Sequence, residues 1–138
     1  VGSSLHIGAR GPTNDGSVFN HTREVGYGLI NGSELFKTGL NNTAKRVVES
    51  LKGRSVYLCF DMDFFDPSCA PGVCTPTWGG PTSREGLEFL QNLAGLNLVG
   101  ADINTVSPPH DISGMTAFLA ATVGLEILTL FCHSKNLI

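Results

Sequence analysis

Two aspartates separated by one residue are the first side chains in this sequence that could do chemistry. Asp61 and Asp63 directly follow the apolar run 56–60, which has the length and composition of a buried strand. Side chains two apart on a strand point to the same face, so both carboxylates can be directed at one point. Carboxylate oxygens suit Mg, Mn or Ca, or a harder transition metal in a mixed site. An Asp at a strand end also commonly forms a turn, and Asp66 before Pro67 is expected to do so.

The loop after these aspartates carries a more specific pattern. It is rich in Pro and Gly, and a helix is expected to begin where it ends, at residues 83–85. The stretch resembles the third signature of the ureohydrolase family, which includes arginase, agmatinase and guanidinobutyrase. The residues that carry the resemblance are Asp61, Asp63, Asp66-Pro67, Ala70-Pro71-Gly72, Thr75-Pro76, Gly79-Gly80 and Thr82-Ser83-Arg84-Glu85. Segment 5–11 is similar to a family strand, and segment 98–130 to the family's carboxyl-terminal strand and helix. The resemblance covers nearly all of the chain but only about the second half of a typical family member.

The resemblance implies hydrolysis of a guanidino or amidino C–N bond with release of urea, using two Mn(II) ions per complete site. By the same resemblance, Asp61 and Asp63 match metal ligands, and Thr75 matches a residue near the bound guanidinium, where its hydroxyl could donate or accept a hydrogen bond. Trp78 replaces a common family residue and could either stack on a substrate cation or cover the loop.

Two departures from the family pattern limit this expectation. The family's other metal ligands come from upstream motifs, and this sequence has no His-x-Asp-x-His and no Gly-Gly-Asp-His. Two carboxylates alone should not hold two divalent ions, so the isolated chain is expected to be inactive. The family Glu that pairs with the guanidinium is replaced by Thr105, a candidate substrate contact that cannot supply a negative charge. The segment 108–111, Pro-Pro-His-Asp, resembles the agmatinase-type Pro-Pro-Tyr-Asp and favours the agmatinase or guanidinobutyrase branch.

Three functional hypotheses follow from these residues. The first is a ureohydrolase-like metallohydrolase that is active when its missing part is present. The second is a non-catalytic relative of the same fold that acts as a binding or oligomerisation module. The third is an unrelated mononuclear site, such as one for zinc, built from some of the residues Asp61, Asp63, Cys69, Cys74 and His110.

Composition narrows the class of protein. The chain has 138 residues, of which 41% are hydrophobic and 15% charged, with a net charge of −3, so no basic footprint for nucleic acid is present. The cysteines are interpreted as reduced, with Cys59 and Cys132 in the core, which favours a cytoplasmic location. The apolar stretch 118–132 is interpreted as too short to span a bilayer.

The chain begins with Val rather than Met, which suggests a partial domain over 1–138. The expected partners are a guanidino small molecule and further copies of the chain.

The elements that would position the aspartates alternate between strand and helix. Strands are predicted at 3–9, 27–30, 56–60 and 96–103, and helices at 21–26, from 42 to a stop at Gly53, at 83–93 and at 115–133. Ser33 and Ser113 are the predicted caps of the helices that follow them. This alternation predicts an α/β fold, a three-layer arrangement with a parallel sheet between helices on both faces, of which about half is present. An uncovered sheet edge and flank are expected as a result.

Overall fold

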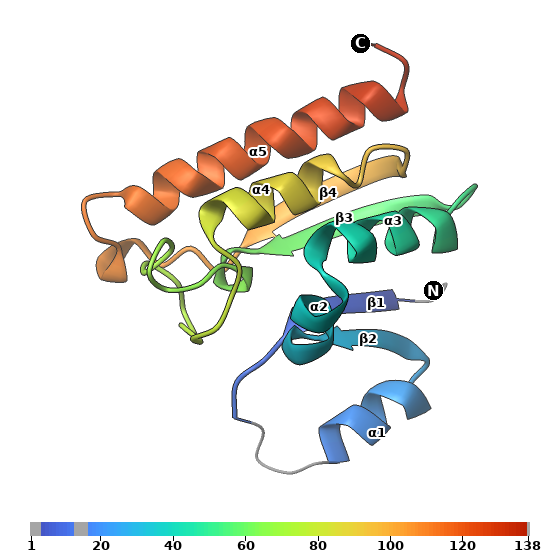
Figure 1. The fold of residues 1–138 in the computed structure, drawn as a ribbon. Helices are drawn as coiled ribbons and strands as arrows, with labels where there is room; N and C mark the ends of the chain where they lie inside the picture. Colours follow the sequence, from blue (N-terminus) through green and yellow to red (C-terminus); the bar gives the residue numbers. More distant parts are fainter. Residues whose placement is uncertain (1–3, 13–16, 138) are drawn as a thin grey trace.

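The computed structural model describes residues 4–12 and 17–137, in which strands and helices alternate as predicted (Figure 1). The order of elements is β1 (Ser4–Ala9), α1 (Ser17–Glu24), β2 (Tyr27–Asn31), α2 (Gly32–Thr38), α3 (Leu40–Ser50), β3 (Ser55–Asp61), the 3-10 helix η1 (Met62–Phe64), α4 (Ser83–Gln91), β4 (Asn97–Asn104), the 3-10 helix η2 (Pro108–His110) and α5 (Met115–Ser134). The predicted α/β class with parallel strands is confirmed.

The four strands form two separate pairs rather than one continuous sheet. β1 pairs with β2 and β3 pairs with β4, both in parallel, and no strand hydrogen bond joins the two pairs within the described chain. All four strands run in the same direction, so their carboxyl ends lie along one edge of the molecule (Figure 1). Side chains at this edge come from segments far apart in the sequence, which is the arrangement that α/β proteins use for ligand sites.

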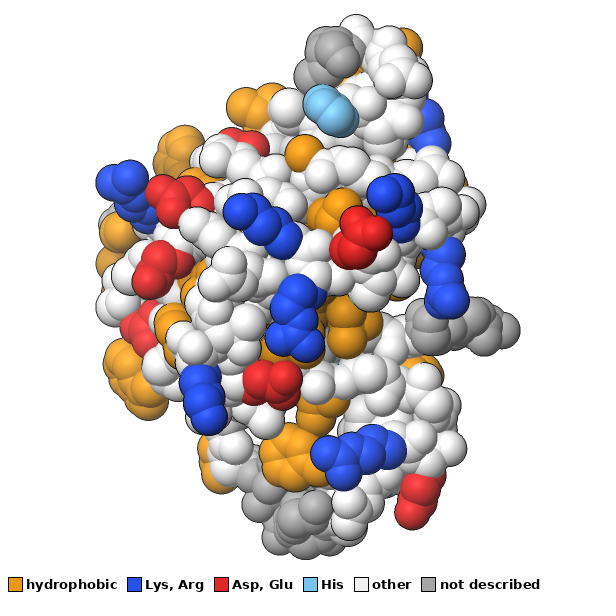
Figure 2. All heavy atoms as spheres, turned by 45° about the vertical axis from the view of Figure 1, so that its right-hand side comes forward, with side chains coloured by type: hydrophobic (Ala, Val, Ile, Leu, Met, Phe, Trp, Pro, Cys, Tyr) orange, Lys and Arg blue, Asp and Glu red, His pale blue; other side chains and the backbone are white. Residues whose placement is uncertain are grey.

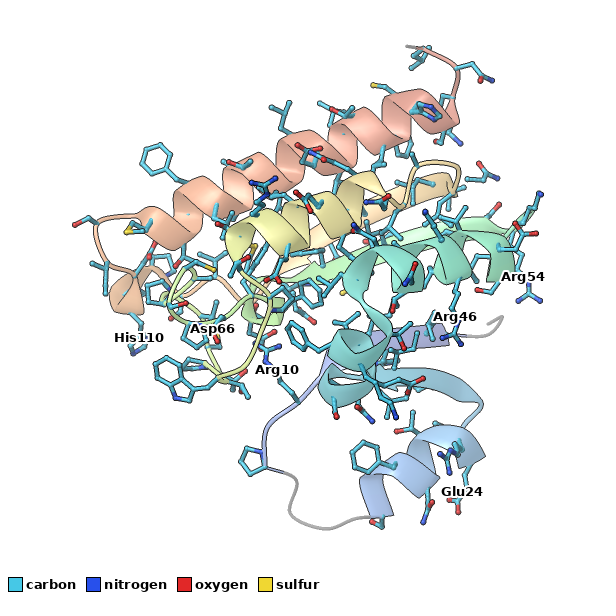
Figure 3. All side chains as sticks on the ribbon, in the orientation of Figure 1. Arg10, Glu24, Arg46, Arg54, Asp66 and His110 are labelled. Carbon is cyan, nitrogen blue, oxygen red and sulfur yellow. The ribbon has the colours of Figure 1, made fainter. Side chains whose placement is uncertain are left out.

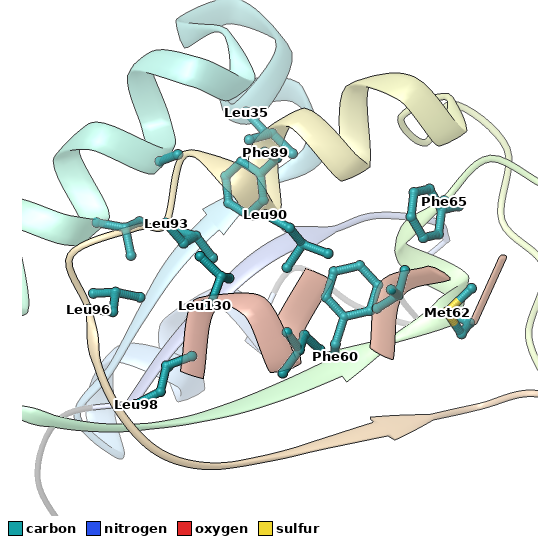
Figure 4. Close-up of a cluster of buried hydrophobic side chains, with 14 of the residues drawn as sticks. Leu35, Phe60, Met62, Phe65, Phe89, Leu90, Leu93, Leu96, Leu98 and Leu130 are labelled. Carbon is teal, nitrogen blue, oxygen red and sulfur yellow. The ribbon is translucent and has the colours of Figure 1, made fainter. Parts of the chain in front are cut away.

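Helices α3, α4 and α5 cover one face of the β3–β4 pair. Val56, Leu58 and Phe60 face the helices and alternate with the exposed Tyr57 and Cys59 on the opposite face. The buried cluster between sheet and helices is apolar throughout (Figure 4) and includes Leu35, Val47, Phe65, Phe89, Leu90, Leu93, Leu96, Leu98, Val123, Ile127 and Leu130. The uncovered flank expected from the sequence is therefore present, and the prediction that Cys59 lies in the core is wrong.

Helix α5 agrees with the predicted helix 115–133 to within one residue. It has 20 residues, so the prediction that this apolar segment is too short to span a bilayer is wrong: by length and composition alone it could cross a membrane. In the structure α5 packs against β4 and α4 and buries Val123, Ile127 and Leu130 there. Its outer side carries exposed Phe118 and Leu125. The helix thus covers the sheet, and its second apolar side has no partner among the described residues.

The helix starts correct two predicted caps. The side chain of Asn31, not Ser33, caps α2 by accepting the Glu34 N–H at 2.9 Å, because Asn31 is the extended residue that immediately precedes the first turn. Ser113 does not cap α5 with its side chain. The carboxylate of Asp111 reaches over it and accepts the N–H groups of residues 116 and 117, both at 3.0 Å.

Of two further helix starts, one differs from its prediction and the other agrees with it. Helix α3 begins at Leu40, earlier than the predicted start, because Gly39 takes a φ of 85° and ends α2 directly before it. Helix α4 begins as predicted at Ser83. Thr82 caps it and Glu85 reaches back to the Thr82 N–H, which completes a capping box.

Candidate metal and substrate site

The two aspartates lie at the carboxyl edge of β3, but only one belongs to the strand. Asp61 is the last residue of β3, whereas Asp63 lies in η1. The prediction that strand pleating directs both carboxylates to one face is therefore wrong, and a tight 3-10 turn brings them together instead. Partial burial raises the pKa of Asp61, and the negative charges of Asp63 and Asp102 raise it further. Three carboxylates from β3, η1 and β4 thus lie within electrostatic range at this edge.

Both predicted threonines contact Asp63. The Thr75 hydroxyl donates a hydrogen bond to Oδ2 of Asp63 at 2.8 Å. The Thr105 hydroxyl accepts the Asp63 backbone N–H at 3.3 Å and donates to the carbonyl of Asn104 at 2.7 Å. Thr105 also has a φ of 69°, a conformation that β-branched residues rarely adopt. The structure therefore brings Asp61, Asp63, Thr75 and Thr105 together, and both hydroxyls help to hold Asp63.

Asp102 is held on the open side of the β3–β4 pair. The Tyr57 hydroxyl donates to its Oδ2 at 2.8 Å, and the Asn104 amide donates to its Oδ1 at 2.6 Å. The hydrogen bond from Tyr57, and then that from Cys59, hold the pKa of Asp102 below its usual value. Asp102 is thus a carboxylate with partners of its own beside the Asp61–Asp63 pair.

Arg10 is a site residue that the sequence did not point to. Its guanidinium Nη2 donates to the backbone carbonyls of Asp63 at 2.7 Å, Phe65 at 2.9 Å and Thr77 at 2.9 Å, and its Nε donates to the same Thr77 carbonyl at 3.2 Å. Figure 3 shows Arg10 below this loop, with Asp66 close by. Partial burial lowers the pKa of Arg10, while the charges of Asp63 and Asp66 oppose the shift. The sequence contains one hint of this role: Arg10 lies in segment 5–11, which is similar to a strand of the family.

Asp66 organises the loop from within, as its predicted role in a turn implies. Its Oδ1 accepts the Ser68 N–H at 3.0 Å, and its Oδ2 accepts the N–H groups of Gly79 at 2.8 Å and Gly80 at 3.2 Å. These bonds, with that from the Ser68 side chain first among the causes, lower the pKa of Asp66 to about 2. The two ends of the Pro/Gly loop are thereby tied to one carboxylate.

Trp78, in the loop between η1 and α4, is 75% exposed, so it does not cover the loop. A stacking contact with a ligand remains open to it.

A cleft of about 960 Å³ separates the two strand pairs and opens beside the aspartates. Its walls come from β1 and β3, and its lining includes Arg10, Asp61, Asp63 and Thr77. The cleft therefore connects the predicted site with the interior of the molecule.

On the molecular face in Figure 2, Lys and Arg side chains are interspersed with Asp and Glu rather than gathered in a basic stripe.

The donor set fits a hard divalent ion in type but not in number. Carboxylate oxygens are what Mn(II) prefers, yet no three His, Cys, Asp or Glu side chains come close enough to hold an ion within residues 4–12 and 17–137. Cys69 donates to backbone carbonyls, and His110 Nδ1 lies 2.7 Å from the Ser107 hydroxyl. The hypothesis of a mononuclear site that includes Cys69, Cys74 or His110 therefore gains no support.

Comparison with known proteins agrees with the geometry. Residues 2–129 match the arginase family. Guanidinopropionase of Pseudomonas aeruginosa is 37% identical over 131 residues, which is 95% of this chain and 41% of that protein. The mitochondrial guanidino acid hydrolase of Homo sapiens is 35% identical, over 90% of this chain and 35% of that protein. The solved structure of proclavaminate amidino hydrolase from Streptomyces clavuligerus superimposes with a TM-score of 0.85 at 35% identity, over 94% of this chain and 42% of that one. The chain thus spans about two fifths of the length of the proteins it resembles.

Proposed function

The chain belongs to the arginase family, and from that membership we propose that it forms part of a hydrolase that breaks a guanidino or amidino C–N bond and releases urea. The names of similar proteins support this substrate class, since guanidinopropionase, guanidinobutyrase and agmatinase all match over most of this chain. The observation that carries the proposal is the Asp61–Asp63 pair, with Asp63 held by Thr75 at the mouth of a cleft.

In this proposal Asp61 and Asp63 hold manganese, two ions in the complete site. The raised pKa of Asp61, which partial burial and neighbouring negative charge produce, supports the assignment, because a cation beside these groups would relieve the repulsion. The chemistry that manganese supplies in such a site is a water of lowered pKa that can serve as the nucleophile. Further ligands must come from outside the described residues, and the open cleft gives them a route to the two carboxylates.

Thr75, Thr105 and Trp78 are the proposed substrate contacts. The Thr75 hydroxyl is already oriented by Asp63 and retains lone pairs toward the site. Thr105 brings no charge, so a guanidinium would be held here by neutral groups and by the aspartates. The exposed indole of Trp78 is free to stack on a planar cation.

A metal-content measurement tests the proposal directly. The purified chain is dialysed against micromolar Mn(II) and analysed for metal, beside an Asp61→Asn/Asp63→Asn double variant and a surface control, Glu88→Gln. The proposal expects the wild type and the control to retain more manganese than the double variant. Because further ligands must come from outside the described residues, release of urea from 4-guanidinobutyrate, 3-guanidinopropionate or agmatine is expected only from a completed site. Manganese no higher than in the double variant overturns the assignment of Asp61 and Asp63 as manganese ligands.

The second candidate is a non-catalytic binding or oligomerisation module. The lack of a third metal-ligating side chain among the described residues favours it, as does the exposed apolar side of α5. Self-association in sedimentation experiments, without metal binding, is the result expected from this alternative.

A further inference from the structure

Arg10 connects two parts of the molecule that the strands themselves do not join. It follows β1, which belongs to the first strand pair, and its guanidinium reaches the loop that follows β3 in the second pair. Three of the four carbonyls it contacts lie 53, 55 and 67 residues away in the sequence, and the fourth is that of Gly8 in β1. One half-buried side chain therefore fixes the position of this loop relative to β1.

The acceptors are all backbone carbonyls, which leaves the nearby carboxylates available. The carbonyls of Asp63 and Phe65 bracket the end of η1, so bonds to both fix the 63–64 and 65–66 peptide planes. The Thr77 carbonyl ties the far side of the loop, which carries Thr75, to the same guanidinium. The geometry thus places a metal-ligand candidate and a substrate-contact candidate on one common support.

The loop is shaped around this guanidinium. A Cβ atom on Gly80 would lie 2.5 Å from Nη2 of Arg10 and 2.6 Å from the Asp66 nitrogen, so only glycine allows the backbone to approach this closely. A planar guanidinium offers its donors in a rigid fork, whereas the ammonium of lysine is a compact point charge on a flexible stem. Lysine at position 10 could not serve carbonyls on both sides of the loop in the same way.

We propose that Arg10 is a positioning residue that sets the geometry of η1 and the following loop, and thereby the placement of Asp63 and Thr75. The importance of that placement for metal and substrate rests on the proposed function. The support of the loop by Arg10 does not, because it depends only on hydrogen bonds within this chain.

Hydrogen exchange measured by mass spectrometry on the full chain tests the proposal without metal or substrate. The variants are Arg10→Met, which removes the donors, and Arg10→Lys, which keeps the charge. Arg84→Met is the control, because Arg84 pairs with Glu88 on the surface of α4. In both Arg10 variants we expect exchange in segment 62–80 to rise about tenfold or more, with α4 and α5 unchanged. The control should match the wild type throughout.

Two outcomes overturn the proposal: unchanged exchange in segment 62–80, or a rise spread evenly over the chain, which would mark a general loss of stability. If Arg10→Met does not fold, Arg10→Lys decides alone, and wild-type exchange in that variant overturns the role of the planar fork. Manganese titration followed by electron paramagnetic resonance on the same proteins separates this proposal from the proposed function. Absence of binding to the wild type counts against the function, while the exchange result still decides the role of Arg10.

Discussion

Thr75 donates a hydrogen bond of 2.8 Å to the carboxylate of Asp63, which lies 12 residues earlier, in η1 at the start of the same loop. The bond joins a proposed substrate contact to a proposed metal ligand. It therefore couples metal binding and substrate binding through one pair of side chains. A substitution at either residue should change the position or the hydrogen bonding of the other.

Replacing Thr75 by Val keeps the shape of the side chain and removes its donor. We expect the unfolding free energy to fall by about 1 kcal/mol and the affinity for manganese in a completed site to fall several-fold. Thr75→Ser retains the hydroxyl and should stay close to the wild type in both. Urea denaturation and metal titration measure the two effects, and a Val variant equal to the Ser variant would remove the coupling.

Two helix glycines should respond oppositely to the same substitution. A Cβ on Gly86 of α4 would lie 2.2 Å from the Phe65 ring, whereas a Cβ on Gly124 of α5 would meet Ile103 at 3.5 Å, an ordinary contact. Gly86→Ala should therefore cost about 1–3 kcal/mol by overpacking. Gly124→Ala should be neutral or stabilising by up to about 1 kcal/mol, because alanine favours the helix. Chemical denaturation of both variants provides the comparison.

Asp66 should make stability depend on pH in the acid range. Its pKa is lowered from 3.8 to about 2 in the folded chain by hydrogen bonds from Ser68, Gly79 and Gly80. A lowered folded-state pKa stabilises the protein above the unfolded-state pKa, and this contribution disappears as the pH falls from about 4 to about 2. Asp66→Asn should consequently be less stable than the wild type at neutral pH, with the difference shrinking over that range. Thermal unfolding as a function of pH would show a constant difference if Asp66 had no such role.

Asp111 should matter more for α5 than Ser113 does. Burial would raise the pKa of Asp111, but the N–H groups of Thr116, Ala117 and Ile112 and the Thr116 hydroxyl lower it on balance, which reflects its role as the cap. Asp111→Ala leaves these N–H groups without their acceptor and should lower the Tm by a few degrees. Ser113→Gly should not lower it, because Ser113 holds a positive φ of 53° that glycine adopts freely. Calorimetry of the two variants would reverse this ranking if Ser113 were the cap.

The order of the elements and the place of Asp61 at the end of a strand could be predicted because both depend on short segments. Apolar runs of strand length, helical spacing and the Pro/Gly loop are local signals, and they placed Asp61 at a strand end. The turn at Asp63 could not be predicted, because a spacing of two residues fits a continuing strand as well as a 3-10 turn. The predicted serine caps were wrong for a similar reason. A serine near a helix start is a general signal, whereas the residue that actually caps the helix is the one whose oxygen reaches the free N–H groups.

The role of Arg10 and the division of the sheet depend on contacts between distant segments. Nothing near Arg10 in the sequence shows that three of its acceptors are carbonyls more than 50 residues away. Likewise, each strand could be recognised alone, but which edges pair is decided by packing of the whole chain. The cleft between β1 and β3 was therefore outside the reach of any local pattern.

The division of the strands into two pairs has a consequence for how the chain unfolds. Strand hydrogen bonds end at the cleft, so within the described residues the β1–β2 pair can open while the β3–β4 pair and its helices stay intact. β1 and β2 place only partly buried side chains, Leu5, Ile7 and Ile30, against the main apolar core, whereas β3 and β4 bury Phe60 and Leu98 in it. A two-stranded pair with so little buried support is marginally stable in water. Melting should thus proceed in two stages rather than as one all-or-none event, and the calorimetric enthalpy should exceed the van't Hoff enthalpy. We therefore expect the β3–β4 half of the described chain to be more stable than the β1–β2 half.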